Sequence, residues 1–159
     1  MEKILEVKNL HIHFNAFAGA VHAIRGVNFH LNKGETLAIV GESGSGKSVT
    51  TKAVTRILPE NAVVDSGEII YKGRNLLQIP DKEFAGLRGS EIGMIFQDPL
   101  SALDPVMRIG KQISETLIIK QKIPKKEASA RALELMRAVG IPEAEKRFNE
   151  YPFQFSGGM

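Results

Sequence analysis

The chain has 159 residues, of which 43% are hydrophobic and 25% charged, an ordinary balance for a folded globular protein. It contains no cysteine, which excludes a disulfide framework and thiolate metal sites and fits a cytosolic setting. The 21 basic and 18 acidic residues are scattered and give a formal charge of +3, so no concentrated basic patch points to a nucleic-acid partner. Residues 1–6 do not read as a signal peptide, and no apolar run reaches the roughly 20 residues of a membrane span. We therefore expect any membrane association to depend on a partner protein.

The first 97 residues are rich in predicted strands. Alternating or continuous apolar patterns predict strands at 4–14, 21–31, 36–40, 67–72 and 92–96. The run at 36–40 (TLAIV) is typical of a strand buried on both faces of a parallel sheet. Helices are expected after a glycine-rich loop, as far as about Ile57, and at 80–87.

The pattern becomes helical after Asp98. Two Pro and two Asp indicate a loop at 98–105, apolar spacing predicts two helical segments over 109–139 separated at Pro124, and a short helix is expected at 143–148. This change predicts a domain division into 1–97 and 98–159.

The glycine-rich loop carries the most specific chemistry. Residues 41–48 read Gly41-Glu42-Ser43-Gly44-Ser45-Gly46-Lys47-Ser48 and fit the phosphate-loop pattern G-x-x-x-x-G-K-S/T between a predicted strand and a helix. Gly44 and Gly46 allow backbone angles closed to other residues, and successive N–H groups at a helix N-terminus can cradle an anion. Lys47 would contact the β- and γ-phosphates, and the Ser48 hydroxyl would bind Mg²⁺. A Rossmann dinucleotide loop is disfavoured because its glycine spacing fails here.

A phosphate loop alone leaves GTPases, kinases and motor ATPases open. Gln97 follows an apolar strand, and Phe155-Ser156-Gly157-Gly158-Met159 resembles the LSGGQ signature of ATP-binding-cassette (ABC) ATPases. The stretches 41–50, 96–106 and 151–159 are more closely similar to the oligopeptide/dipeptide/nickel importer branch, and Met159 resembles the first of the two ATPases in such systems. The resemblance spans essentially the whole chain but only about half of such a family member.

This resemblance implies an α/β fold: a P-loop NTPase core, the ABC ATPase type, with an antiparallel β subdomain and a truncated helical subdomain. It implies ATP and Mg²⁺ as cofactors, with Ser48 and Gln97 at the metal and with Lys47 and Gln97 in catalysis. Ser156, Gly157 and Gly158 would meet the γ-phosphate of ATP held by a second ATPase subunit, and Phe14 would stack on adenine. The residues expected to bind nucleotide are Phe14, Gly41, Ser43, Gly44, Ser45, Gly46, Lys47, Ser48, Val49, Ser156, Gly157 and Gly158.

The same resemblance implies partners and a location. These are a second, distinct ABC ATPase subunit, two membrane permeases, indirectly an extracellular or periplasmic solute-binding protein, and the cytoplasmic face of the cell membrane. The loop 98–105 would help to form the groove that receives a short helix of a permease. No nucleic-acid partner is expected.

Two departures from the family pattern limit what we expect of this chain. Val49 stands where many cassette ATPases have a threonine, which removes one hydroxyl contact to phosphate. The chain also stops before the acidic Walker B strand, the catalytic glutamate and the switch histidine. We expect an ATPase as the full-length protein, and weak nucleotide binding without hydrolysis from these 159 residues alone.

Other readings remain open at this point. The solute could be nickel or another small molecule, and a non-transport cassette ATPase acting on DNA or ribosomes, or a phosphate-loop kinase or GTPase, would share the loop. His11 and His13 share one strand face and are interpreted as hydrogen-bonded or solvated. The basic stretch 120–126 is interpreted as a solvated helix junction.

Overall fold

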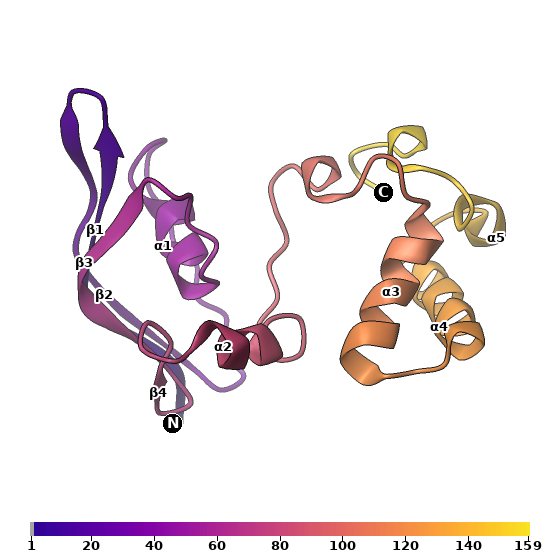
Figure 1. Cartoon of the computed structure of the whole chain (residues 1–159), viewed down its shortest axis with the longest axis horizontal. Coiled ribbons are helices and arrows are strands. Elements are labelled where there is room, and N and C mark those ends of the chain that lie inside the picture. Colours follow the sequence, from indigo (N-terminus) through magenta and orange to yellow (C-terminus); the bar gives the residue numbers. More distant parts are fainter. Residues whose placement is uncertain (1) are drawn as a thin grey trace. The chain divides into compact units, whose positions relative to one another are not determined.

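The computed structural model describes residues 2–159. The chain forms two compact units, the first ending at Arg88 and the second running from Gly89 to Met159. The first contains all the strands, and the second is helical (Figure 1). The predicted domain division after Gln97 stays a prediction.

The first unit is built on a four-stranded antiparallel sheet. It consists of β1 (Lys3–Ala16), β2 (Gly19–Asn32), β3 (Ala62–Tyr71) and β4 (Arg74–Asn75), in the order β2-β1-β3-β4. The central strand, β1, pairs along most of its length with both β2 and β3. The strands predicted at 4–14, 21–31 and 67–72 are confirmed, and β3 begins five residues earlier than expected.

A β-bulge in β1 brings its apolar residues to one face. Val7 and Leu10 are three residues apart and would point to opposite faces of a regular strand, yet both are buried. The register shifts between them, and Asn9 takes a φ of +44°. Gly67 of β3 faces this bulge, where a Cβ would lie 2.7 Å from the backbone of Lys8, Asn9 and Leu10. The bulge thereby restores a continuous buried face on β1.

Two short helices complete the first unit. Helix α1 (Lys47–Val54) lies on one face of the sheet, and α2 (Asp81–Leu87) begins after Pro80, as predicted (Figure 1). Arg88 donates to the carbonyl oxygens of Thr55 and Arg56 and thus satisfies acceptors that the end of α1 leaves free. The guanidinium groups of Arg56 and Arg88 both lie over the ring of Phe84, 5.0 and 5.2 Å from its centroid. The C-terminus of α1 is therefore tied to α2.

Two of the predicted strands do not form. Residues 36–40 and 93–96 have no regular secondary structure, and Ile92 takes part only in an isolated bridge. Their side chains remain accessible, with Val40 90% and Ile95 94% exposed. A strand of a parallel sheet needs neighbouring strands to pair with, and within residues 2–159 neither segment is part of a sheet.

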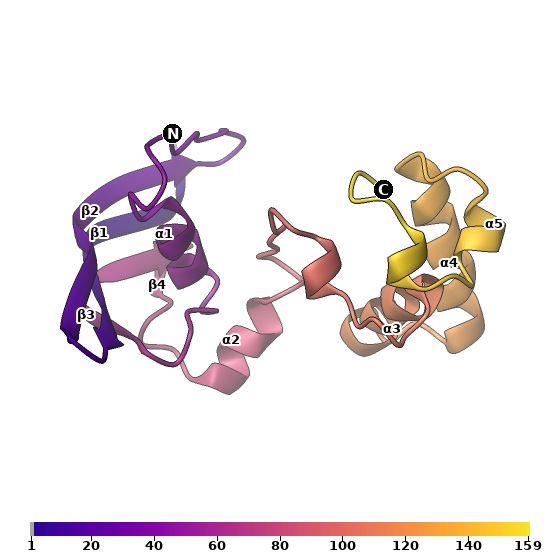
Figure 2. The same ribbon diagram turned by 90° about the horizontal axis from the view of Figure 1, so that it is seen from above.

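The second unit is an assembly of short helices, shown from above in Figure 2. It contains a 3₁₀ turn (Leu100–Ala102), α3 (Ile109–Gln121), α4 (Lys125–Ala138), α5 (Ala144–Arg147) and a second 3₁₀ turn (Pro152–Gln154). The prediction of two helices separated at Pro124, followed by a short one, is confirmed. Phe148 packs against both hydrophobic clusters of this unit, and a Cβ on Gly110 would lie 2.4 Å from its ring.

Candidate nucleotide-binding site

The phosphate loop (residues 41–48) adopts the backbone conformation that its glycines were expected to allow. Gly44 and Gly46 have φ angles of +81° and +91°, in the region that disfavours side chains. Gly46 is buried against β2, where an added Cβ would lie 2.5 Å from Ile24 Cδ1 and 3.0 Å from the Ala23 carbonyl oxygen. The loop thus rests directly on the sheet, and Gly46 is the residue that permits this close approach.

The Lys47 ammonium group lies within the loop. Its Nζ donates to the carbonyl oxygens of Gly41 at 2.7 Å and Glu42 at 2.6 Å, and contacts Ser45 Oγ at 3.4 Å. The backbone N–H of Ser45 donates to the Glu42 carbonyl oxygen and closes the turn. A full positive charge is therefore held against the backbone of the loop, between two of its carbonyl oxygens.

Helix α1 begins at Lys47 and directs its N-terminus at this loop. Gly46 is the N-cap, no side chain caps the helix, and no acidic residue lies in its first turn. The first N–H groups of such a helix lack intrahelical acceptors and carry its positive dipole end, a combination that favours an anion. Exposed Ser48, in the first turn, offers its hydroxyl, while Val49 is half-buried. Residues 41–48 together fit a polyphosphate and its Mg²⁺.

Thr50 supports the loop in a way that motif reading did not identify. It is buried, and its backbone N–H and its Oγ1 both donate to the Gly46 carbonyl oxygen, at 2.9 and 3.0 Å. A threonine hydroxyl in a helix can donate to the carbonyl oxygen four residues earlier. The position of Thr50, four residues after the N-cap, is the local signal from which this contact could have been predicted.

Phe14 lies near the loop on the same sheet. It is half-buried in β1, two residues beyond Ile12, whose cross-strand partner is Ile24. Since Ile24 contacts Gly46, Phe14 stands about 7 Å further along the strand, on the same face. Phe17, in the turn between β1 and β2, is fully exposed. Stacking of Phe14 on adenine stays a prediction.

Gln97 and the segment after it belong to the second unit. Gln97 is exposed and lies outside any helix or strand. The following loop is held locally, because Asp98 accepts from the Leu100 N–H and its carbonyl oxygen accepts from Ser101 Oγ. The loop lines an apolar cavity of about 330 Å³ through Pro99, Leu100 and Leu103, which face Ile113, Met136 and Phe155. The role of Gln97 at Mg²⁺ stays a prediction.

The Ser-Gly-Gly segment (Ser156–Gly158) is exposed near the end of the second unit. It follows the second 3₁₀ turn, and the Met159 N–H donates to the Ser156 carbonyl oxygen, so the segment is itself a tight turn. A Cβ on Gly157 or Gly158 would meet nothing within 4 Å. Both glycines therefore leave the backbone open to an approaching group.

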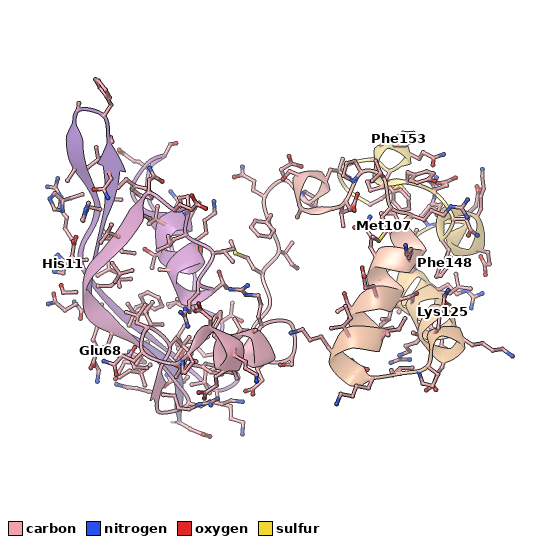
Figure 3. All side chains as sticks on the ribbon, viewed as in Figure 1. His11, Glu68, Met107, Lys125, Phe148 and Phe153 are labelled. Carbon is pink, nitrogen blue, oxygen red and sulfur yellow. The ribbon has the colours of Figure 1, made fainter. Side chains whose placement is uncertain are left out.

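The histidines of β1 are hydrogen-bonded, as predicted. His13 Nδ1 lies 2.7 Å from Asp65 Oδ1 on β3, and its Nε2 lies 3.2 Å from Asn15 Oδ1. The Asp65 carboxylate raises the pKa of His13 because it stabilises the imidazolium form. His11 contacts Asn9, and Figure 3 shows it on the sheet face away from α1. Within residues 2–159, no group of three or more His, Cys, Asp or Glu side chains is arranged to hold a metal ion.

No helix within residues 2–159 is both long and apolar enough to cross a membrane.

Comparison with known proteins identifies close relatives of this chain. The chain is 59% identical over 159 residues to the dipeptide transport ATP-binding protein DppD of Lactococcus lactis, covering 99% of this chain and 46% of that protein. It is 55% identical to the oligopeptide transport ATP-binding protein OppD of Bacillus subtilis, covering 99% of this chain and 44% of that one. The chain thus spans about half the length of these relatives.

Solved structures of ATP-binding cassettes match the fold of this chain and confirm the predicted fold class. A solved dimer of the ATP-binding cassette MJ0796 in a post-hydrolysis state, bound to ADP and Pi, superposes with a TM-score of 0.83 at 26% identity, covering 97% of this chain and 64% of that one. The family model for ABC transporters matches residues 24–159, which include the phosphate loop and the Ser-Gly-Gly segment. The chain belongs to the ABC transporter family.

Proposed function

We propose that this chain is part of the ATP-binding subunit of an importer that couples ATP binding and hydrolysis to the uptake of dipeptides or oligopeptides. The observation that carries the proposal is the phosphate loop, in which Lys47 Nζ, at the start of α1, lies between the carbonyl oxygens of Gly41 and Glu42 and contacts Ser45 Oγ. The relatives that are named for dipeptide and oligopeptide transport support the choice of solute.

The nucleotide is ATP with Mg²⁺. Lys47 and the N–H groups of the loop bind the β- and γ-phosphates, and the Ser48 hydroxyl and the Gln97 side chain would hold the metal ion, which would offset phosphate charge. Phe14 stacks on the adenine. Lys47 stabilises the charge that develops as the γ-phosphate leaves, and Gln97 orients the attacking water.

The Ser-Gly-Gly segment completes a second ATP site. Its exposed backbone and hydroxyl contact the γ-phosphate of ATP held by a second ATPase subunit, and this chain's own loop is completed in the same way by that subunit. A solved relative that is dimeric and bound to ADP and Pi supports this arrangement. Two membrane permeases are the remaining partners at the cytoplasmic face of the membrane, and the apolar cavity beside Leu100 and Leu103 supports contact with one of them. The solute-binding protein acts through these permeases.

Calorimetry with Mg-ATP on the full-length protein tests the nucleotide site. Lys47→Ala removes a charge-assisted contact and should weaken binding by about tenfold to a hundredfold. Lys52→Ala, on the same helix but outside the loop, is the matched control and should bind as the unchanged protein does. Equal affinity in the Lys47→Ala variant would refute the site.

Uptake by the reconstituted transporter tests the solute. A labelled dipeptide and a labelled pentapeptide should accumulate in an ATP-dependent manner, and nickel should not. Nickel uptake without peptide uptake would favour the alternative importer, and ATP turnover that responds to DNA or ribosomes but not to permeases would favour a non-transport cassette ATPase.

A further inference from the structure

We propose that Arg147 is a positioning residue that holds the Ser-Gly-Gly segment in the orientation needed to meet a phosphate. The inference rests on the proposed function of that segment. Arg147 is the last residue of α5, and its side chain is only 23% exposed. An arginine buried to this degree normally has its planar group fully engaged by neighbours.

Three contacts fix the guanidinium group of Arg147. It lies over the ring of Phe155, 5.6 Å from the centroid, which is a cation–π geometry. Its Nε donates to the Pro142 carbonyl oxygen at 3.1 Å, and Nη1 pairs with Glu150 Oε2 at 3.2 Å. Glu150 is also mostly buried, at 15% exposed. The group is therefore held from the residues that precede α5, that follow it, and that lead to the Ser-Gly-Gly segment.

Phe155 transmits this position to the segment because it directly precedes Ser156. Its ring packs against the cluster of Ile109, Met136 and Ala144 on one side and against Arg147 on another. Its N–H donates to the Pro152 carbonyl oxygen, so the 3₁₀ turn enters the segment in a defined direction.

The chain before Phe155 is anchored as well. The Ile109 N–H at the start of α3 donates to the Glu150 carbonyl oxygen, and the Gly110 N–H donates to that of Phe148. In Figure 3, Phe148 lies beside α3, and Phe153 lies in the second 3₁₀ turn. The exposed glycines have no side chains that could anchor them. Their placement therefore depends on Phe155 and on Arg147, which holds Phe155.

The chemistry of phosphate contact makes this placement matter. N–H groups and a hydroxyl stabilise a phosphate only when they reach its oxygens at about 3 Å, and a displacement of about 1 Å can cost about a hundredfold in rate. Lysine cannot replace arginine here, because its ammonium lacks the planar face for Phe155 and the fork that serves Pro142 and Glu150 together.

The test uses Arg147→Lys in the full-length protein assembled with its partner ATPase and permeases. ATP turnover should fall by about tenfold or more. Photolabelling with azido-ATP should decrease at the partner subunit, because the Ser-Gly-Gly segment completes the ATP site of that subunit. Labelling of this subunit should remain unchanged. A merely structural role would not produce this asymmetry. Arg131→Lys, at an exposed ion pair with Glu134 on α4, is the matched control and should match the unchanged complex.

A second comparison keeps the inference separate from folding. Phe155→Leu keeps the apolar packing and removes the ring face, so Arg147→Lys should cause little further loss of turnover when combined with it. Additive losses would overturn the inference. Ser156→Arg should abolish turnover: if it does while Arg147→Lys turns over normally, the inference fails and the proposed function stands. Normal turnover with Ser156→Arg would refute the proposed function itself.

Discussion

Two glycines of the phosphate loop share a backbone conformation but not an environment. Gly44 and Gly46 both have positive φ angles, yet a Cβ on Gly44 would meet nothing within 4 Å. A Cβ on Gly46 would be pressed against Ile24 and the Ala23 carbonyl oxygen. The conformational requirement is common to both positions, whereas the steric one belongs to Gly46 alone.

Alanine at these positions should therefore have unequal effects. Gly44→Ala should cost about 1–2 kcal/mol of stability, since only the left-handed backbone is penalised. Gly46→Ala should cost more and also weaken Mg-ATP binding by about tenfold, because the loop must move off β2 to relieve the contact with backbone. Chemical denaturation and calorimetry on the full-length protein measure both effects. Equal losses in the two variants would contradict this account of Gly46.

At the scale of elements, one ion pair joins the central strand to its neighbour. His13 on β1 contacts Asp65 on β3, with Asn15 on its other ring nitrogen and the ring of His22 on β2 at 5.7 Å. Both ring nitrogens face oxygen acceptors, an arrangement suited to the imidazolium form, which donates from both. The pairing of β1 with β3 thus contains an imidazole whose pKa is raised above its ordinary value by the Asp65 carboxylate.

This pair should make stability depend on pH. The pKa of His13 is raised above 6.5 in the folded protein by Asp65, so its stabilisation is present below about pH 6.5 and is lost as the pH rises through the raised value. In Asp65→Asn, the fall in the free energy of unfolding between about pH 6 and pH 9 should become smaller. Urea denaturation at both values measures it. His30→Gln, at an exposed position of β2, is the control and should keep the full pH dependence; the same fall in Asp65→Asn would argue against the pair.

At the scale of the molecule, two apolar runs that are not part of the sheet, 36–40 and 92–96, include side chains that are almost fully accessible to solvent. Val40 and Ile95 are almost fully exposed, in runs whose composition is typical of buried strands. Monomeric proteins rarely leave large contiguous apolar surfaces uncovered, since these drive association.

The 159-residue chain by itself should therefore self-associate and bind a hydrophobic dye. Val40→Thr combined with Ile95→Thr should reduce dye fluorescence and shift the chain toward monomer in size-exclusion chromatography. Val106→Thr is the matched control, since Val106 is 83% exposed but lies outside both runs. An equal reduction by Val106→Thr would show that general exposure, not these runs, causes the association.

Much of the local structure followed from local pattern. The helices around Pro124 and the long antiparallel strands have strong periodicity and clear breaks, and both are present. The prediction of strands at 36–40 and 92–96 was wrong. A strand depends on hydrogen bonds to residues elsewhere in the chain, and its own composition does not supply them. The bulge at Asn9 could not be predicted from the sequence either, because it depends on the close approach of Gly67 on β3.

The amino-acid sequence by itself determined the phosphate loop and the Ser-Gly-Gly segment as candidate sites, because each is a short contiguous motif whose chemistry lies in its own residues. Only the tertiary structure decided what supports them. Ile24 and Ala23 pack against Gly46, and Thr50 donates to the Gly46 carbonyl oxygen. Arg147 packs against the ring of Phe155. These contacts join residues from different elements, and their geometry depends on packing and register, which no local pattern encodes.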